Sequence, residues 1–229
     1  MTRSFVLAVF VWWNVTGITA AAGAVKFANP GNYRKALQSL AAGDTLQLAA
    51  GTYTAGLPIT NCHGRVNDWI TIEGPASGGV AEIRQTQVAN CVELRQCSYV
   101  ALKRLKIQGE GASGIPGVFG ISAQGGLGNP VHHILIEDCI VSDWNTSQQA
   151  VGISTKAPAW DWTIRGNKIL NCGTGLYLGN SNGGSLCPWR DREQPGAESA
   201  RVLSGDQVSE AASRRRGDAG YTQQHACPS

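Results

Sequence analysis

The chain has 229 residues, of which 15% are charged, and its formal net charge at pH 7 is +3. This length suits one domain or two closely packed ones. The 29 glycines show no period of three and only 9 residues are proline, which excludes collagen and fits generic disorder poorly. The composition is typical of a globular, β-rich protein with many turns.

The first 24 residues are expected to form a secretory signal peptide. Arg3 supplies a positive charge, an apolar stretch covers residues 5–18, and small residues at 22–24 form a cleavage site before Val25. An uncleaved anchor is the alternative, but polar residues and a glycine interrupt the stretch, which is shorter than the ~18 clean apolar residues that a membrane span needs. We expect a secreted or periplasmic protein with no stable membrane span after cleavage.

A repeat organises the middle of the chain. Four similar stretches align on apolar residues that are 30, 34 and 28 positions apart: Ile72, Leu102, Ile136 and Ile164. A second set begins with glycine in each case and aligns on Ile121, Ile153 and Leu176. Each period contains at least three short strands and no convincing helix.

Such short strands bury a face only if each one pairs with its equivalent one period later, so that one apolar interior is shared along a stack. The repeat therefore predicts a parallel β-solenoid. Alternating apolar residues also fit a β-sandwich, but matching positions in two independent sets favour the solenoid. Within it, Cys139 and Cys172, 33 residues apart, should stack or form a disulfide. Asn167, in a turn, should join a ladder of side-chain amides, which satisfies turn backbone groups.

The segment NPGNYRKALQSLAAGDTLQLAAGTY, residues 29–53, resembles the first coil of secreted right-handed parallel β-helix proteins. That superfamily includes pectate, alginate and chondroitin lyases. The resemblance covers about residues 25–184. It implies an all-β, single-stranded right-handed parallel β-helix (solenoid) whose short N-terminal capping helix lies in residues 32–40. Lyase activity is implied less specifically, because the superfamily also holds hydrolases, epimerases and proteins of no known activity.

The pattern stops near residue 185. The segment 185–229 contains no isoleucine and holds six of the 19 lysines and arginines, without the interleaved aromatic residues of a nucleic-acid surface. We expect a solvated, disordered tail and no nucleic-acid partner. The codons for residues 188–197, displaced by one nucleotide, permit another repeat unit. Our hypothesis is a frame shift that truncates a longer β-helix protein; a natural extension is the alternative.

Seven cysteines fit export to an oxidising compartment, where a structural or disulfide role is expected. The sequence has no CxxC or HExxH metal signature, and we assign no metal ligand. Glu137 and Asp138 are turn carboxylates for which a solvated turn is favoured over a calcium site. The cofactor is therefore left open, with calcium as the candidate.

In the lyases, β-elimination needs a proton-abstracting base beside positive charge. Alternation predicts an outward polar stripe on adjacent coils: Ser122, Gln124, Ser154, Lys156, Tyr177, Asn180 and Asn182. We expect Lys156 and Tyr177 to be catalytic. The lysine would hold a carboxylate, and the tyrosine would stack on a sugar ring or move a proton. The other five would bind substrate. Ordinary solvent-facing residues are the alternative reading of the stripe.

Two other groups leave alternatives open. His132 and His133 look like a pair of bases, but packing is the favoured interpretation, because one of them should flank an inward strand. Four tryptophans suit a sugar platform and the shielding of core edges equally well: Trp69, Trp144, Trp160 and Trp162.

The predicted function is that of a secreted polysaccharide-active protein, most like a lyase that cleaves an acidic glycan, a uronic-acid polymer, by β-elimination. Whether the shortened chain is active is left open. The alternative is a non-catalytic carbohydrate-binding or cell-surface solenoid. The expected partner is an acidic polysaccharide, and we expect a monomer.

Overall fold

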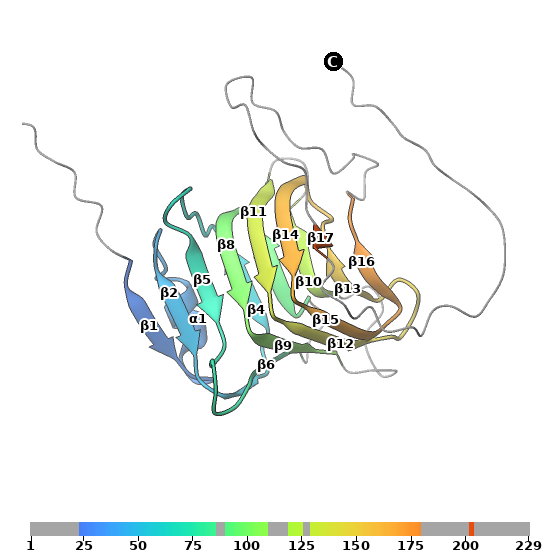
Figure 1. Cartoon of the computed structure of the whole chain (residues 1–229), viewed down its shortest axis with the longest axis horizontal. Coiled ribbons are helices and arrows are strands. Elements are labelled where there is room, and N and C mark those ends of the chain that lie inside the picture. The colour runs from blue at the N-terminus through green and yellow to red at the C-terminus, as the bar shows by residue number, and fades with distance from the viewer. Residues whose placement is uncertain (1–22, 86–89, 110–118, 126–128, 180–201, 204–229) are drawn as a thin grey trace, which may run out of the picture.

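The computed structural model describes residues 23–85, 90–109, 119–125, 129–179 and 202–203. Its strands form three sheets, and every ladder between these strands is parallel (Figure 1). The predicted signal segment lies outside the described residues, as do Asn180 and Asn182.

Sheet 1 contains, in spatial order, β1 (Val25–Ala28), β2 (Thr45–Leu48), β5 (Ile70–Glu73), β8 (Cys97–Lys103), β11 (Val131–Glu137), β14 (Ala159–Arg165) and β17 (Val202–Leu203). Sheet 2 contains β3 (Gly51–Tyr53), β6 (Ala81–Arg84), β9 (Leu105–Gln108), β12 (Ile140–Trp144) and β15 (Lys168–Cys172). Sheet 3 contains β4 (Leu57–Thr60), β7 (Val92–Arg95), β10 (Phe119–Gln124), β13 (Val151–Ser154) and β16 (Thr174–Tyr177).

From β2 to β16 the chain visits the three sheets in turn, so each coil adds one strand to each sheet. Residues one coil apart are then lateral neighbours, as in a parallel β-solenoid. Both predicted alignments are confirmed. Leu102 lies opposite Ile72 on one side and Ile136 on the other, and Ile136 lies opposite Ile164. In sheet 3, Ile153 lies between Ile121 and Leu176.

The core consists of apolar rows that run from coil to coil inside the three sheets. Leu46, Ile72, Leu102 and Ile136 form one row and are all 0% exposed. Burying one such side chain contributes ~1.5–3 kcal/mol. Because each row continues into the next coil, neighbouring coils stabilise one another.

Glycine begins the matching strand segment in three successive coils of sheet 3, at Gly120, Gly152 and Gly175. A Cβ atom on Gly152 would lie 2.8 Å from the carbonyl oxygen of Gly175 and 3.3 Å from Sγ of Cys172 on sheet 2. Sheets 2 and 3 meet too closely here for any side chain. This close approach explains the glycines at 120 and 152, whereas a Cβ atom on Gly175 would meet only Ile169, at 3.6 Å.

At the corner between sheets 1 and 2, each of three successive coils has a turn residue with left-handed backbone angles. These residues are Arg104, Asp138 and Gly166. The next residue in the last of these turns is Asn167. Its Oδ1 accepts a hydrogen bond from the backbone N–H of Cys139 (2.8 Å), and its Nδ2 donates to the carbonyl of Ile136 (2.8 Å). Asn167 thus satisfies turn backbone groups as predicted. Its counterpart in the preceding coil is Cys139, so the predicted ladder of side-chain amides does not continue there.

The predicted pairing of two cysteines is wrong. Cys172 lies opposite Trp144, whereas Cys139 lies one corner earlier in the coil, beside Asn167. All five described cysteines are free thiols, and burial raises the pKa of the Cys139 thiol to about 12. The spacing of 33 residues equals one period, but loops of unequal length shift the register within each coil.

The only described helix is α1 (Tyr33–Leu37), which is shorter than the predicted segment 32–40 and buries Tyr33 and Leu37. That it closes the end of the core stays a prediction. Among the described residues, no helix is long and apolar enough to cross a membrane. The predicted disordered tail lies outside the described residues except for β17, which pairs with β14 in parallel.

Candidate functional site

The predicted polar stripe lies on sheet 3. Ser154 is the register partner of Ser122 on one side and of Tyr177 on the other, as predicted from the repeat. The inward neighbours of these residues belong to the hydrophobic core or pack against it. The alternation therefore assigns Ser122, Ser154 and Tyr177 to the correct face of the sheet.

The exposure of the stripe residues differs from the prediction. Ser122 and Ser154 are both 0% exposed. Ser122 accepts a hydrogen bond from the side-chain Nε2 of Gln124 (3.3 Å) and donates to the carbonyl of Ala123 (3.3 Å). The Ser154 hydroxyl has no hydrogen-bond partner within the described residues. The expectation that these serines face solvent is wrong, since alternation says which face a side chain lies on and not what covers it.

The two predicted catalytic residues do come together. Lys156 and Tyr177 line one pocket of about 300 Å³ on the outer side of sheet 3. Five other side chains complete the lining: Phe119, Gln148, Gln149, Val151 and Thr174. Three of these, Phe119, Val151 and Thr174, form a lateral row on β10, β13 and β16. Gln124 is partly buried outside this lining.

Lys156 follows β13 and turns back towards the sheet. Its Nζ lies 3.7 Å from the centroid of the Phe119 ring, a cation–π contact that holds the ammonium at the pocket. Phe119 itself is only 4% exposed. Burial lowers the pKa of Lys156 from its usual value. Among the described residues that line the pocket, Lys156 is the only charged one.

The opposite part of the pocket contains polar groups that accept and donate hydrogen bonds. Tyr177 is 43% exposed, and the side chains of Gln148 and Gln149 are exposed. The hydroxyl of Thr174 donates to the carbonyl of Gln148 (2.7 Å), which ties the preceding turn to β16. One cation, one phenol and two amides without a carboxylate suit an anionic, hydroxyl-rich ligand.

Sequence reasoning missed a cluster of aromatic and imidazole rings on the outer face of sheet 1. Ser98, His132 and Trp160 are register partners on β8, β11 and β14. The rings of His132 and Trp160 stack with centroids 4.3 Å apart, and Tyr99 stacks on His133 at 4.2 Å. Trp69 meets Tyr99 edge to face.

A left-handed residue recurs at the same position of three coils in this cluster. Tyr99, His133 and Asp161 occupy equivalent positions and have φ angles of 54°, 53° and 53°. A left-handed residue breaks the alternation of the strand, and both histidines are half-buried. Both lie in ring stacks, as the favoured packing interpretation predicted. In the sequence, the adjacent pair His132 and His133 was the feature that could have indicated this ring cluster.

Burial and the neighbouring imidazole of His133 lower the pKa of His132 to about 4, so His132 is neutral at pH 7. His133 Nε2 lies 3.4 Å from the carboxylate of Asp161.

The tryptophans divide between the two predicted roles. Trp144 and Trp162 are buried at 5% and 2% exposure, whereas Trp69 and Trp160 lie partly exposed in the ring cluster.

The turn carboxylates do not fit a calcium site. Glu137 forms ion pairs with Lys103 (2.9 Å) and Arg165 (2.5 Å), which hold the pKa of its carboxyl below the usual range. Asp138 is exposed beside it. In the described ranges, no group of three or more His, Cys, Asp and Glu side chains is placed to hold a metal ion.

Comparison of the chain with protein-family models, with curated protein sequences and with solved structures found no match.

Proposed function

We propose that the chain is a right-handed parallel β-helix protein of the pectate lyase-like kind, exported from the cell, that cleaves a uronic-acid polymer by β-elimination. The observation that carries this proposal is that Lys156 and Tyr177, from successive coils, line one open pocket. Its lining contains a cation and no carboxylate, which favours an acidic glycan over a neutral one. In the same proposal α1 caps the first coil and the protein acts as a monomer.

In the proposed reaction the ammonium of Lys156 pairs with the carboxylate of the sugar. It stabilises the enolate that forms when the proton at C5 is lost. The phenol oxygen of Tyr177 accepts that proton while the phenol passes its own O–H proton to the departing O4. The electrons of the C5–H bond form the C4=C5 double bond, and the C4–O4 bond breaks. The oxygen leaves with its bonding pair and takes up the proton that Tyr177 gives, so the products are an unsaturated uronate and a shortened chain.

The lining side chains supply binding rather than chemistry. The amides of Gln148 and Gln149 are placed to bond sugar hydroxyls, and Phe119 keeps the ammonium of Lys156 at the pocket. Among the described residues, no group of three or more His, Cys, Asp and Glu side chains is placed to hold a metal ion, and each step above is assigned to the chain's own side chains.

The test is the ultraviolet absorbance of unsaturated products when the full chain is incubated with alginate, pectate or chondroitin. We expect one of these to be cleaved, and Lys156→Ala and Tyr177→Phe to abolish the signal. Leu178→Ala is the matched control, because Leu178 is exposed, follows Tyr177 and does not line the pocket.

Two results would contradict the lyase. Retention of an acidic polysaccharide in affinity electrophoresis, lost in Lys156→Ala but without any unsaturated product, would favour the non-catalytic binding solenoid. Equal behaviour of Lys156→Ala and Leu178→Ala would remove this pocket from the function altogether.

A further inference from the structure

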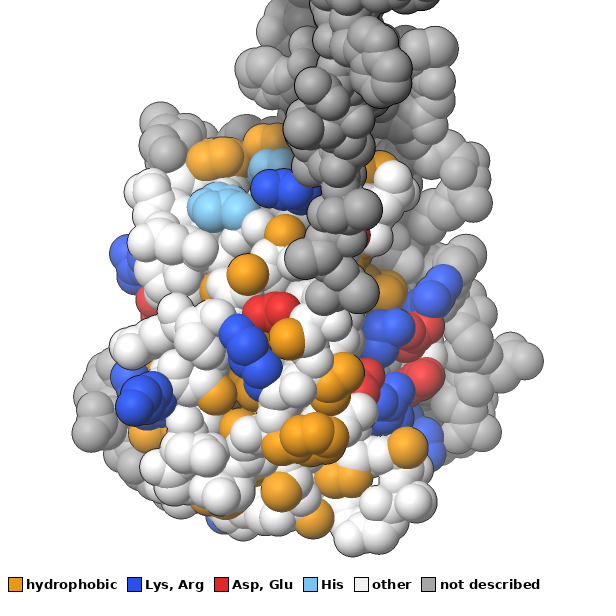
Figure 2. All heavy atoms as spheres, turned by 90° about the vertical axis from the view of Figure 1, so that its left-hand side faces the viewer, with side chains coloured by type: hydrophobic (Ala, Val, Ile, Leu, Met, Phe, Trp, Pro, Cys, Tyr) orange, Lys and Arg blue, Asp and Glu red, His pale blue; other side chains and the backbone are white. Residues whose placement is uncertain are grey.

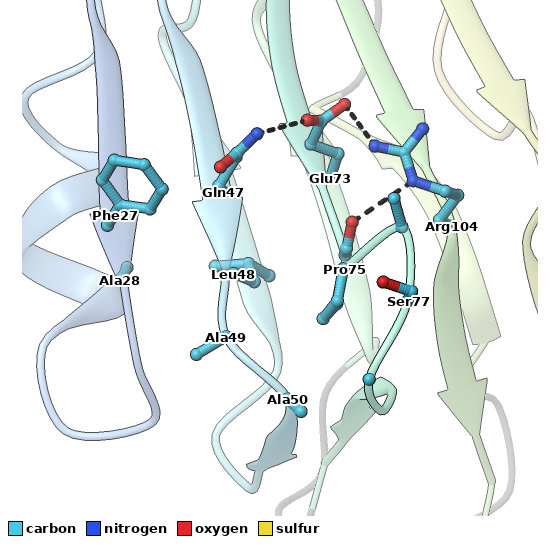
Figure 3. Close-up of a pocket in the computed structure, with 13 residues that line it drawn as sticks. Phe27, Ala28, Gln47, Leu48, Ala49, Ala50, Glu73, Pro75, Ser77 and Arg104 are labelled. Carbon is cyan, nitrogen blue, oxygen red and sulfur yellow. Dashed lines mark hydrogen bonds and ion pairs between the residues drawn. The ribbon is translucent and has the colours of Figure 1, made fainter.

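A second pocket lies on the outer face of sheet 1, among the first coils. Phe27, Gln47 and Glu73 are register partners on β1, β2 and β5, so their side chains form one row across the strands (Figure 3). The pocket has a volume of about 430 Å³, within the range of about 300–1,000 Å³ that small-molecule sites occupy. It shares no lining residue with the Lys156 pocket.

Phe27 is the most exposed large apolar side chain among the described residues, at 74%. Figure 2 shows this end of the molecule, where hydrophobic side chains are exposed among neutral and charged ones. Figure 3 shows the ring of Phe27 on one side of the pocket and the segment with Pro75 and Ser77 on the other. An exposed aromatic ring beside a pocket provides an apolar platform.

The polar part of the row is fixed by its own contacts. Gln47 Nε2 donates to Glu73 Oε1 (3.1 Å), and Arg104 Nη2 lies 2.7 Å from Glu73 Oε2. Arg104 Nε also donates to the carbonyl of Gly74 (3.3 Å). Three planar groups are thus held in place before any ligand arrives, which reduces the entropy that binding costs.

The carboxylate of Glu73 has about four lone-pair sites, so it still accepts hydrogen bonds from a ligand after its two contacts to Gln47 and Arg104. Glu73 and Arg104 also cancel each other's charge, and no other charged residue of the described part of the chain lines the pocket. The pocket therefore offers no net charge to an ionic ligand, in contrast to the Lys156 pocket.

We propose that this pocket binds a neutral saccharide, one or two pyranose rings of a longer glycan. The C–H face of one ring packs on Phe27, and its hydroxyl groups bond to Gln47, Glu73 and Arg104. An apolar platform beside fixed planar polar groups of zero net charge suits a hydroxyl-rich, uncharged ring better than an apolar partner surface. The inference does not depend on the lyase proposal, because the two pockets lie on different sheets.

The experiment uses the full chain and three neutral probes, cellohexaose, mannohexaose and xylohexaose, in isothermal titration calorimetry and saturation-transfer NMR. We expect at least one probe to bind. Phe27→Ala should weaken that binding about tenfold, as loss of an aromatic anchor does. Gln47→Ala should weaken it by a smaller factor. Phe27→Leu, which keeps an apolar side chain without a ring, should behave like Phe27→Ala.

Val25→Ala is the matched control. Val25 lies on the same strand and is 55% exposed, yet it does not line the pocket. Lys156→Ala should also leave binding of the neutral probe unchanged, which separates this site from the one proposed for the acidic glycan. Circular dichroism spectra that match the wild type establish that each variant is folded.

Three outcomes would overturn the proposal. The first is that none of the three probes binds. The second is that Phe27→Ala and Val25→Ala weaken binding equally. The third is that sedimentation velocity shows a dimer that Phe27→Ala dissociates, since Phe27 lies on an end strand and would then be covered by a second copy of the chain.

Discussion

Gly120 and Trp144 face each other where sheets 3 and 2 meet, and a Cβ atom built on Gly120 would lie 3.0 Å from Nε1 of the indole. It would also lie 2.4 Å from the carbonyl oxygen of Gly152 and 2.9 Å from a methyl group of Val141. The backbone oxygen has no room to retreat, because its strand is paired on both sides.

The first prediction follows from this contact. Gly120→Ala should lower the free energy of unfolding by ~1–3 kcal/mol, the usual cost of overpacking a core. The measurement is the urea midpoint of the purified protein. Gly179→Ala serves as the control, because a Cβ atom there meets nothing within 4 Å. If both variants unfold at the wild-type midpoint, the corner is looser than the structure indicates.

A second prediction concerns the turn amide. Asn167→Ala removes both hydrogen bonds of the side chain and leaves the N–H of Cys139 and the carbonyl of Ile136 without their partner. Leaving buried polar groups unsatisfied costs ~1–3 kcal/mol each, so we expect a clear fall in the urea midpoint. Asn167→Asp keeps the hydrogen-bond acceptor and loses the donor, so its urea midpoint should lie between those of the wild type and of Asn167→Ala.

Asn145→Ala is the comparison for that turn. Asn145 is exposed and donates to the side chain of Asn171 (2.9 Å), so its loss should change stability by less than ~0.5 kcal/mol. An Asn167→Ala variant as stable as Asn145→Ala would show that water replaces both bonds.

The third prediction tests the cation–π contact between Lys156 and Phe119. Phe119→Leu keeps an apolar side chain and removes the ring face, a contact worth ~0.5–1 kcal/mol at partly exposed sites. Retention of an acidic polysaccharide should therefore weaken about two- to fivefold, while binding of neutral oligosaccharides stays unchanged. Val151→Ala shortens a neighbour in the same lateral row and preserves the ring, so it should weaken retention less. The opposite order would mean that Val151 shapes the pocket more than the ring does.

Apolar periodicity predicted the coil-to-coil register, because a slip would move a row such as Ile121, Ile153 and Leu176 out of the core. It also placed Lys156 and Tyr177 on one face. The same rule failed at the histidines, since a left-handed residue at His133 breaks the alternation and nothing in the residue type announces it.

The exposure of the stripe residues also could not be predicted from the sequence. Ser122 and Ser154 lie on the predicted face of their strands, but what covers that face is decided by tertiary packing. The pocket beside Phe27 could not be predicted from the sequence for a related reason. It depends on Arg104 turning back across the corner to reach Glu73, and no periodic pattern encodes that contact.

The last prediction concerns acid stability. The folded-state pKa of His132 is lowered to about 4 by burial and by the neighbouring His133, against about 6.5 in the unfolded chain. Between these two values the unfolded chain binds more protons than the folded one. The contribution of His132 to stability is therefore fully present above pH 6.5 and declines as the pH falls from about 6.5 to about 4. Below pH 4 both states are protonated and the decline from this residue ends.

Burial also lowers the pKa of His133, so it adds to the same acid-side loss, although the carboxylate of Asp161 beside it works in the opposite direction. Urea midpoints of the wild type and of His132→Gln, measured from pH 7.5 to pH 4, check this. Glutamine is polar but does not titrate, so the variant should lose less stability on acidification than the wild type. Parallel curves for the two proteins would mean that His132 titrates normally, and that its stack on Trp160 leaves the imidazole open to water.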